Sequence, residues 1–148
     1  MRGLTKKMSL TGIKAGFALT GSFCTFSAVL PEIKKLQDEG AVITPIFSEN
    51  AASIDTRFGK AEDIISEVEE ITSNKVLKTI SEVESIGPQK LIDILIVAPC
   101  TGNTLAKIAA GVTDSAVTMA VKAHLRNGRP VLLAVSTNDG LATGCKNI

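Results

Sequence analysis

The chain has 148 residues, of which 45% are hydrophobic and 21% are charged. This length and composition are typical of one globular domain with a buried core, and they exclude a disordered chain. A net charge of +1 and only five phenylalanines, without tryptophan or tyrosine, argue against a nucleic-acid-binding surface. No apolar run approaches the roughly 18 residues that a membrane span requires.

The cysteines indicate a reduced compartment, and the N-terminus can be weighed as an extension or as a signal peptide. Cys24, Cys100 and Cys145 show neither a disulfide framework nor the spacing of a metal site, so the cytoplasm is the simplest location and no metal is expected. Residues 1–12 are interpreted as an N-terminal extension of a domain over 13–148. A signal peptide is the alternative for the first 30 residues, but polar residues interrupt that stretch, which also fits strand, turn and helix.

Hydrophobic periodicity predicts strands that alternate with helices. Strands are expected over 13–19, 41–47, 91–98 and 130–136, and helices over 24–39, 61–73, 103–110 and 115–127. Pro45 indicates that the second strand lies at a sheet edge or carries a late bulge. Residues 48–60 read as a polar loop, and 76–86 is ambiguous. The alternation predicts a single-domain α/β fold, a Rossmann-like or flavodoxin-like three-layer sandwich with a mainly parallel sheet.

The segment 97–107 is the most informative part of the sequence. Pro99 is expected to end the third strand because it lacks an N–H group, and Asn103 or Thr104 is expected to cap the following helix. Thr101, Gly102, Asn103 and Thr104 would then present polar groups at the carboxyl end of a strand, where open α/β sheets bind ligands. This edge suits a planar polar ring such as a flavin. An ordinary strand-to-helix turn is the alternative.

Two more loops are expected at the same edge of the sheet. Thr20-Gly21-Ser22 follows the first strand, and Ser48 follows the second. A glycine turn before a helix offers N–H groups to a phosphate, although the glycine spacing of dinucleotide-binding loops and the lysine of phosphate-binding loops are both missing. A capped turn and an ordinary loop serine are the alternatives.

The segment 97–107 resembles the Pro-Ala-Ser-Ala-Asn-Thr signature of flavoproteins that include peptidyl-cysteine and phosphopantothenoylcysteine decarboxylases. Pro99, Asn103 and Thr104 match it, while Cys100, Thr101 and Gly102 replace the residues between. The resemblance implies FMN as the cofactor. It also implies a set of cofactor contacts from the three loops: Thr20, Gly21, Ser22, Ser48, Pro99, Thr101, Gly102, Asn103 and Thr104.

Cysteine decarboxylases of this family use a histidine in the segment after the second strand. The corresponding segment here, 50–59, contains none. His124 is the only histidine of the chain, and it lies in an expected helix, where a surface or half-buried role fits better than catalysis. The sequence therefore disfavours cysteine decarboxylation, and it identifies no catalytic base.

Asp55-Thr56-Arg57-Phe58-Gly59 instead resembles a segment of dipicolinate synthase B subunits, and the resemblance covers residues 13 to about 139. It implies a subunit that helps to oxidise a dihydro- or hydroxytetrahydro-dipicolinate to dipicolinate during sporulation. The implied partners are the A subunit of that enzyme, which binds NADP, and further copies of this chain. Arg57 would bind a carboxylate of the dicarboxylate substrate through two hydrogen bonds, or else be a surface arginine.

The resemblance also implies a final strand and tail, and the last nine residues depart from the family pattern, so the domain is expected to be incomplete at its C-terminus. Three other functions stay open. They are an FMN-dependent decarboxylase that takes its histidine from a neighbouring chain, a non-catalytic regulatory subunit, and a transferase similar to the prenyl-flavin synthases.

Overall fold

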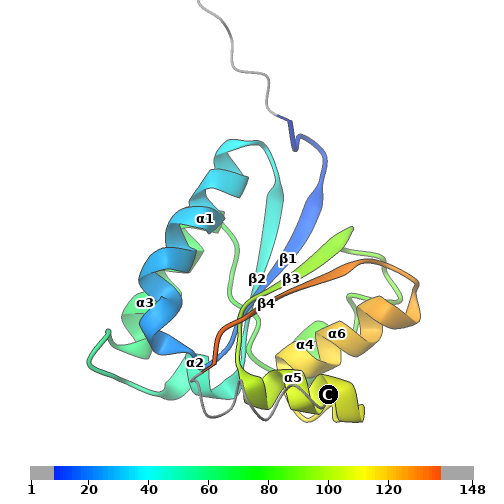
Figure 1. The fold of residues 1–148 in the computed structure, drawn as a ribbon. Coiled ribbons are helices and arrows are strands. Elements are labelled where there is room, and N and C mark those ends of the chain that lie inside the picture. The colour runs from blue at the N-terminus through cyan, green and yellow to red at the C-terminus, as the bar shows by residue number, and fades with distance from the viewer. Residues whose placement is uncertain (1–8, 138–148) are drawn as a thin grey trace, which may run out of the picture.

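A computed structural model describes residues 9–137 as four parallel strands with helices on both faces (Figure 1). The strands lie in the order β2–β1–β3–β4, with bounds β1 Lys14–Leu19, β2 Val42–Phe47, β3 Ile94–Cys100 and β4 Val131–Val135. The helices are α1 Phe26–Asp38, α2 Glu49–Ser53, α3 Ala61–Thr72, α4 Ile80–Val83, α5 Gly102–Ala110 and α6 Ala116–Arg126. The predicted α/β sandwich with a parallel sheet is confirmed.

The central strand β1 is buried on both faces. Phe17 and Leu19 join the core cluster under α1 and α3, whereas Ala18 joins the cluster under α6. A Cβ atom at Gly16 would lie 2.7 Å from Ile92 Cδ1, so a larger residue there would displace this buried side chain. Burial on both faces explains why this strand is a continuous apolar run rather than an alternating one.

The third strand differs from its prediction, because it runs through Pro99 and ends at Cys100. The pairing of β3 with β4 shifts register between Val97 and Cys100, so the proline lies at an irregularity where the ladder does not need its missing N–H. The Pro99 carbonyl still accepts a hydrogen bond from Thr20 N at 3.2 Å. The expectation that Pro99 stops the strand was therefore wrong.

Two segments that the sequence left without a helix contain short ones. Residues 48–60 were expected to be a loop but include α2. The ambiguous segment 76–86 contains α4, which is stabilised by a capping box between Thr79 and Glu82. Both helices are only one turn long, so hydrophobic periodicity could not reveal them.

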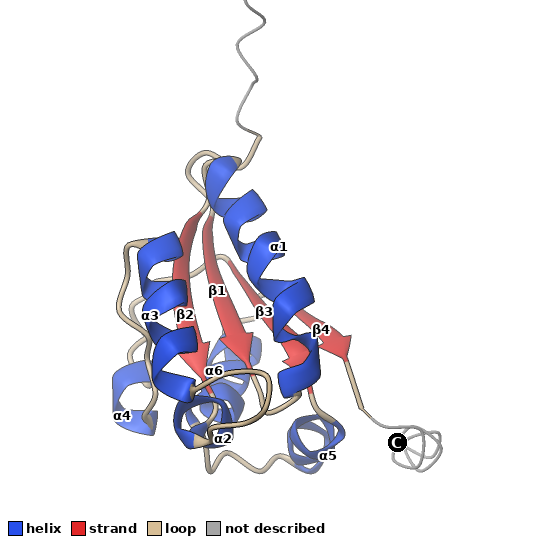
Figure 2. Cartoon of the chain, turned by 90° about the vertical axis from the view of Figure 1, so that its left-hand side faces the viewer, coloured by secondary structure: helices blue, strands red, loops and turns tan. Residues whose placement is uncertain are grey.

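The two edge strands differ in how well they are covered. Pro45 lies in β2, which is an edge strand as predicted. Strand β4 lies at the other edge, as Figure 2 shows. The Leu132 and Val135 side chains of β4 are 55% and 50% exposed.

Residues 9–12 form a turn against the end of α1, where Leu10 N donates to Glu39 O at 2.9 Å. The remainder of the predicted extension and the expected C-terminal departure lie outside the described residues. The limits of the domain therefore stay a prediction. Within residues 9–137, no helix is long and apolar enough to cross a membrane.

Candidate functional site

The three predicted loops meet at the carboxyl edge of the sheet, where two adjoining cavities open. The first, here called the arginine pocket, measures about 490 Å³ and is lined by Gly21, Ser22, Phe23, Cys24, Arg57, Phe58, Thr101, Gly102, Asn103, Ser136 and Thr137. The second, here called the polar pocket, measures about 290 Å³ and is lined by Gly21, Ser48, Glu49, Asn50, Thr101, Asn103, Thr104, Lys107, Asp114 and Ser115. Because Gly21, Thr101 and Asn103 line both cavities, one elongated ligand can occupy them together.

Thr20 and Pro99, two of the predicted contacts, line neither cavity and instead join the two loops. The Thr20 hydroxyl donates to Pro99 O at 2.6 Å and accepts from Thr101 N at 3.0 Å. Thr20 is only 1% exposed, so both hydrogen bonds are shielded from water. This arrangement holds the ends of β1 and β3 at one separation and thereby positions the residues that do line the pockets.

Three helices begin at the polar pocket, and each is capped by a side chain that lines it. The Ser48 hydroxyl accepts from Ala51 N at 3.2 Å at the start of α2, and the Ser115 hydroxyl accepts from Thr118 N at 3.2 Å at the start of α6. At the start of α5, the cap is Thr101. Helix N-termini carry partial positive charge and exposed N–H groups, which favour an anion.

The expectation that Asn103 or Thr104 caps α5 was wrong. Thr101 is the cap instead, and its Oγ1 accepts a hydrogen bond from Thr104 N at 3.1 Å. The strand continues to Cys100 and α5 begins at Gly102, so Thr101 is the one residue between them. The side chain of Asn103 is exposed and has no hydrogen bond to any residue within 9–137. Its amide is therefore available to a ligand.

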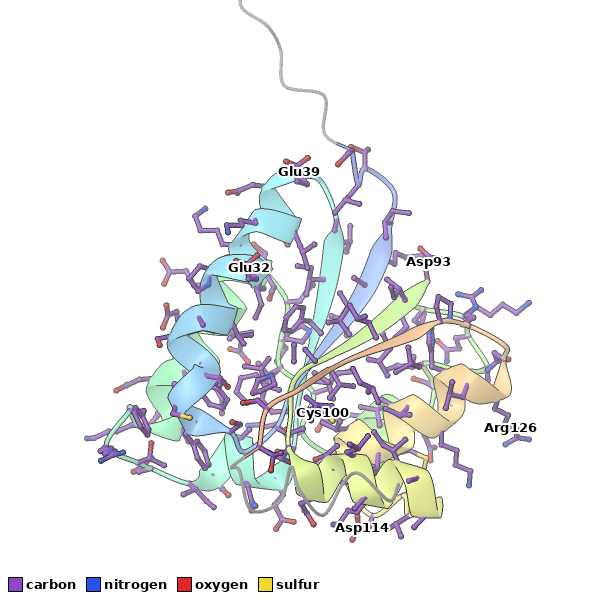
Figure 3. The ribbon with its side chains drawn as sticks, viewed as in Figure 1. Glu32, Glu39, Asp93, Cys100, Asp114 and Arg126 are labelled. Carbon is purple, nitrogen blue, oxygen red and sulfur yellow. The ribbon has the colours of Figure 1, made fainter. Side chains whose placement is uncertain are left out.

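The charged groups of the polar pocket are partly paired. Lys107 Nζ lies 3.0 Å from Asp114 Oδ1. Figure 3 shows Asp114 at the lower end of the molecule. Glu49 also lines the pocket. An anion bound here would therefore depend on helix N-termini and hydroxyl groups rather than on an unpaired cation.

The arginine pocket presents one cation and two aromatic rings. Arg57 Cζ lies 4.9 Å from the ring centroid of Phe58, a cation–π contact. Arg57 has no ion pair with a described residue, so its guanidinium remains available to a carboxylate. Across the pocket, Ser22 Oγ lies 3.1 Å from Ser136 Oγ, which ties the first loop to the end of β4.

Several lining residues were not assigned a role from the sequence: Phe23, Cys24, Glu49, Asn50, Phe58, Lys107, Asp114, Ser115, Ser136 and Thr137. Ser136 and Thr137 follow the fourth strand and could have been found by the same strand-end argument that located Ser48. Phe58 and Lys107 carried no local signal, because their place depends on how α3 and α5 pack.

Neither the buried thiol nor the histidine supplies a base at this edge. Burial raises the pKa of Cys100 to about 11, so its thiol stays protonated at neutral pH. His124 is 1% exposed, against the expectation of a surface or half-buried place, because α6 packs this side of the helix onto the sheet. Burial and the charge of Arg129 lower the pKa of His124.

His124 is also far from the pockets. It lies near Asp93 and Pro130, which precede β3 and β4 at the amino edge of the sheet. Figure 3 shows Asp93 at the upper right, at the start of β3, and Asp114 at the bottom of the molecule. Since the chain has one histidine, none of its own imidazoles reaches the candidate site.

The sequence profile of the family described as Flavoprotein matches residues 4–142. The chain is 43% identical over 140 residues to the B subunit of dipicolinate synthase from Bacillus subtilis, a match that covers 95% of this chain and 70% of that protein. The chain belongs to the flavoprotein family, among its dipicolinate synthase B subunits.

Solved structures of flavoproteins agree with this assignment. The crystal structure of the dipicolinate synthase B subunit from Bacillus halodurans matches with a TM-score of 0.80 and 39% identity, covering 93% of this chain and 71% of that one. The FMN-dependent cysteine decarboxylase SpaF matches with a TM-score of 0.73 and 20% identity, covering 90% of this chain and 73% of that one. At this identity, the second likeness concerns the fold alone.

Proposed function

We propose that this chain is the FMN-binding subunit of a dipicolinate synthase and helps to oxidise a dihydro- or hydroxytetrahydro-dipicolinate to dipicolinate. The observation that carries the proposal is the continuous edge at which Gly21, Thr101 and Asn103 join two pockets, in a chain of the B-subunit group. The edge has the polarity gradient that a flavin mononucleotide requires.

The donor set fits FMN. The polar pocket offers helix N-termini and the hydroxyls of Ser48 and Ser115 to a phosphate and a sugar-alcohol chain. The arginine pocket offers the rings of Phe23 and Phe58 to a flat ring system, and the Asn103 amide can both donate and accept at the ring edge. When bound, FMN would supply a two-electron acceptor beside the substrate.

Arg57 is proposed to bind the substrate. A guanidinium group recognises a carboxylate through two parallel hydrogen bonds, which fixes orientation as well as charge. Arg57 enters the arginine pocket from the loop after α2 and has no competing carboxylate within residues 9–137. A cyclic diacid would therefore lie with one carboxylate on Arg57 and its ring beside the flavin.

The chemistry is proposed to need a partner, because neither the buried thiol nor the histidine of this chain can act as the base at this edge. Cys100 is protonated, and His124 lies at the other end of the sheet. General acid–base catalysis requires a group of suitable pKa within hydrogen-bond reach of the substrate. We assign acid–base catalysis to an NADP-binding A subunit. We further propose that the enzyme is cytoplasmic and that this chain forms a homo-oligomer within it.

Cofactor choice can be measured directly. We expect the purified chain to bind FMN more tightly than FAD or NADP, because the polar pocket offers its helix N-termini to a phosphate and the glycine spacing of dinucleotide-binding loops is missing. Titration with each compound, followed by flavin fluorescence or calorimetry, tests this order. Tighter NADP binding, or no flavin binding, would refute the cofactor assignment.

Partner dependence requires a second assay. Ultraviolet absorbance of dipicolinate is followed with this chain by itself, with the A subunit by itself, and with both. We expect negligible product from this chain by itself and full turnover from the mixture. Full activity without this chain would show that it is not a catalytic component.

An FMN-dependent decarboxylase is the second candidate, and the fold shared with SpaF favours it. It would need a histidine from another chain, because segment 50–59 contains none. Loss of carbon dioxide from a peptide with a C-terminal cysteine, measured by mass spectrometry, would support this candidate. A chain that binds no flavin but activates the A subunit would instead be a regulatory subunit.

A further inference from the structure

The arginine pocket adjoins a third cavity, here called the α1/α3 groove. It measures about 510 Å³ and is lined mainly by apolar side chains: Phe23, Phe26, Ser27, Leu30, Pro31, Lys34, Phe58, Ile64, Glu67 and Ile71. Phe23 and Phe58 are the two side chains that line both this groove and the arginine pocket. These two rings therefore form the common wall between the arginine pocket and an apolar cavity of similar size.

The two rings of the wall are held differently. Phe23 packs edge-to-face on Phe26, with ring centroids 5.6 Å apart and an interplanar angle of 61°, so it belongs to the base of α1. Phe58 is 48% exposed and has the guanidinium of Arg57 over its ring. Phe58 is thus the part of the wall that a substitution can remove without opening the core.

The loop that carries Phe58 is ordered by its own hydrogen bonds. Thr56 and Gly59 exchange two backbone hydrogen bonds, with N···O distances of 3.0 and 3.1 Å. Phe58 N donates to Thr56 Oγ1 at 3.1 Å, and Ala61 N donates to Asp55 Oδ1 at 2.9 Å. Gly59 has φ +144°, which disfavours any other residue at this turn. The backbone that carries the Phe58 ring is therefore ordered before any ligand binds.

We propose that Phe58 determines the size of the carboxylate that this site accepts. It closes the arginine pocket against the α1/α3 groove, and it positions Arg57 through the cation–π contact. The inference rests on the proposed role of Arg57 in substrate binding. With the ring present, the pocket admits a compact cyclic diacid and excludes one with a bulky apolar substituent; without it, the substituent can enter the apolar groove.

The test compares two probes on the protein in the presence of excess FMN: pyridine-2,6-dicarboxylate and its 4-phenyl derivative. Calorimetry gives a dissociation constant for each with wild type, Phe58→Ala and Phe58→Tyr. Ile54→Ala is the matched control, because Ile54 lies on the same segment, is 42% exposed and lines neither cavity.

We expect the wild type to prefer the smaller diacid by at least about tenfold, the scale of discrimination by pocket shape. Phe58→Ala is expected to abolish this preference by binding the smaller probe more weakly and the larger one more tightly. Phe58→Tyr and Ile54→Ala are expected to retain it. A mere loss of packing would weaken the binding of both probes alike and would leave the ratio of their dissociation constants unchanged.

An unchanged ratio in Phe58→Ala would overturn the proposal, as would a wild type that binds neither probe or both equally. Flavin absorbance reports FMN binding separately in every sample. If FMN fails to bind but the ratio still shifts, the cofactor proposal fails and the size-selection role of Phe58 stands. If FMN binds and the ratio does not shift, the reverse holds.

Discussion

At the scale of single residues, Asn103 is available to a ligand because no described residue bonds its side chain. We expect Asn103→Ala to weaken FMN binding about tenfold to a hundredfold, since losing a hydrogen bond that the ligand buries costs on the order of 1–3 kcal/mol. The melting temperature of the apoprotein is expected to stay the same. Fluorescence titration and a thermal melt measure the two effects; unchanged affinity would remove Asn103 from the site.

The cysteines provide a second prediction at this scale. Cys24 is exposed beside the arginine pocket, whereas Cys100 is buried and its pKa is raised to about 11. Alkylation requires the thiolate, which at pH 8 is only about one in a thousand of a thiol with that pKa. Iodoacetamide is therefore expected to modify Cys24 and to spare Cys100 until the protein unfolds.

Peptide mass spectrometry measures this difference on a Cys145→Ser background, because Cys145 lies outside the described residues. Modification of both cysteines at equal rates in the folded protein would contradict the burial of Cys100 at the end of β3.

At the scale of elements, the site depends on how β1 and β3 end together. The Thr20 hydroxyl joins Pro99 O to Thr101 N across 79 and 81 positions of sequence. Thr20→Val keeps the shape of the side chain but leaves these buried polar groups without that partner. We expect the free energy of unfolding to fall by about 1–3 kcal/mol.

Thr20→Ser is the matched control, because it keeps the hydroxyl. Urea denaturation of the two variants separates the hydrogen bonds from the packing of the methyl group. If Thr20→Val were as stable as the wild type, the hydroxyl would not hold the two strand ends.

At the scale of the whole molecule, the two ends of the sheet differ: one forms the pockets, and the other holds a cluster of charged side chains. The carboxyl edge forms the pockets. At the amino edge, the Asp93 carboxylate accepts a hydrogen bond from Lys14 N at 2.8 Å and lies 3.6 Å from Arg129 Nη1, so it connects the starts of β1 and β4. Arg129 also donates to Ile92 O. His124 is buried beside this cluster, and its Nε2 has no hydrogen-bond partner within residues 9–137.

The lowered pKa of His124 makes the stability of the fold depend on pH. Below pH about 6.5, the unfolded chain takes up a proton that the folded chain, with its lower pKa, does not. Stability is therefore complete above that pH and falls as the pH decreases toward the folded-state pKa, by at most about 1.4 kcal/mol per pH unit. Asp93 and Arg129 are the charged groups beside the ring.

Urea denaturation between pH 7.5 and 5.5 measures the decline. Because the chain has one histidine, His124→Gln is expected to remove most of the pH dependence in this range. Equal slopes for wild type and His124→Gln would show that carboxylates, rather than His124, control it.

The sequence by itself determined the parallel α/β fold and predicted the edge at which the candidate site lies. Strand and helix periods are local properties, and parallel connections bring all strand ends to one edge. Gly21, Ser48, Thr101 and Asn103 could therefore be placed together from their positions after strands. The short helices α2 and α4 could not be predicted, because a single helical turn is too short to show a hydrophobic period.

Only the tertiary structure decided which side chains face the pockets. Thr20 lies within the predicted loop, yet its hydroxyl is used inside the protein, whereas Phe58 is shared by two cavities although nothing in its own segment indicates this. The burial of His124 likewise depends on the packing of α6 against the sheet. Local sequence determines which face of an element is apolar, but the partner of each polar group comes from residues far away in the chain, and this pairing decides what remains free for a ligand.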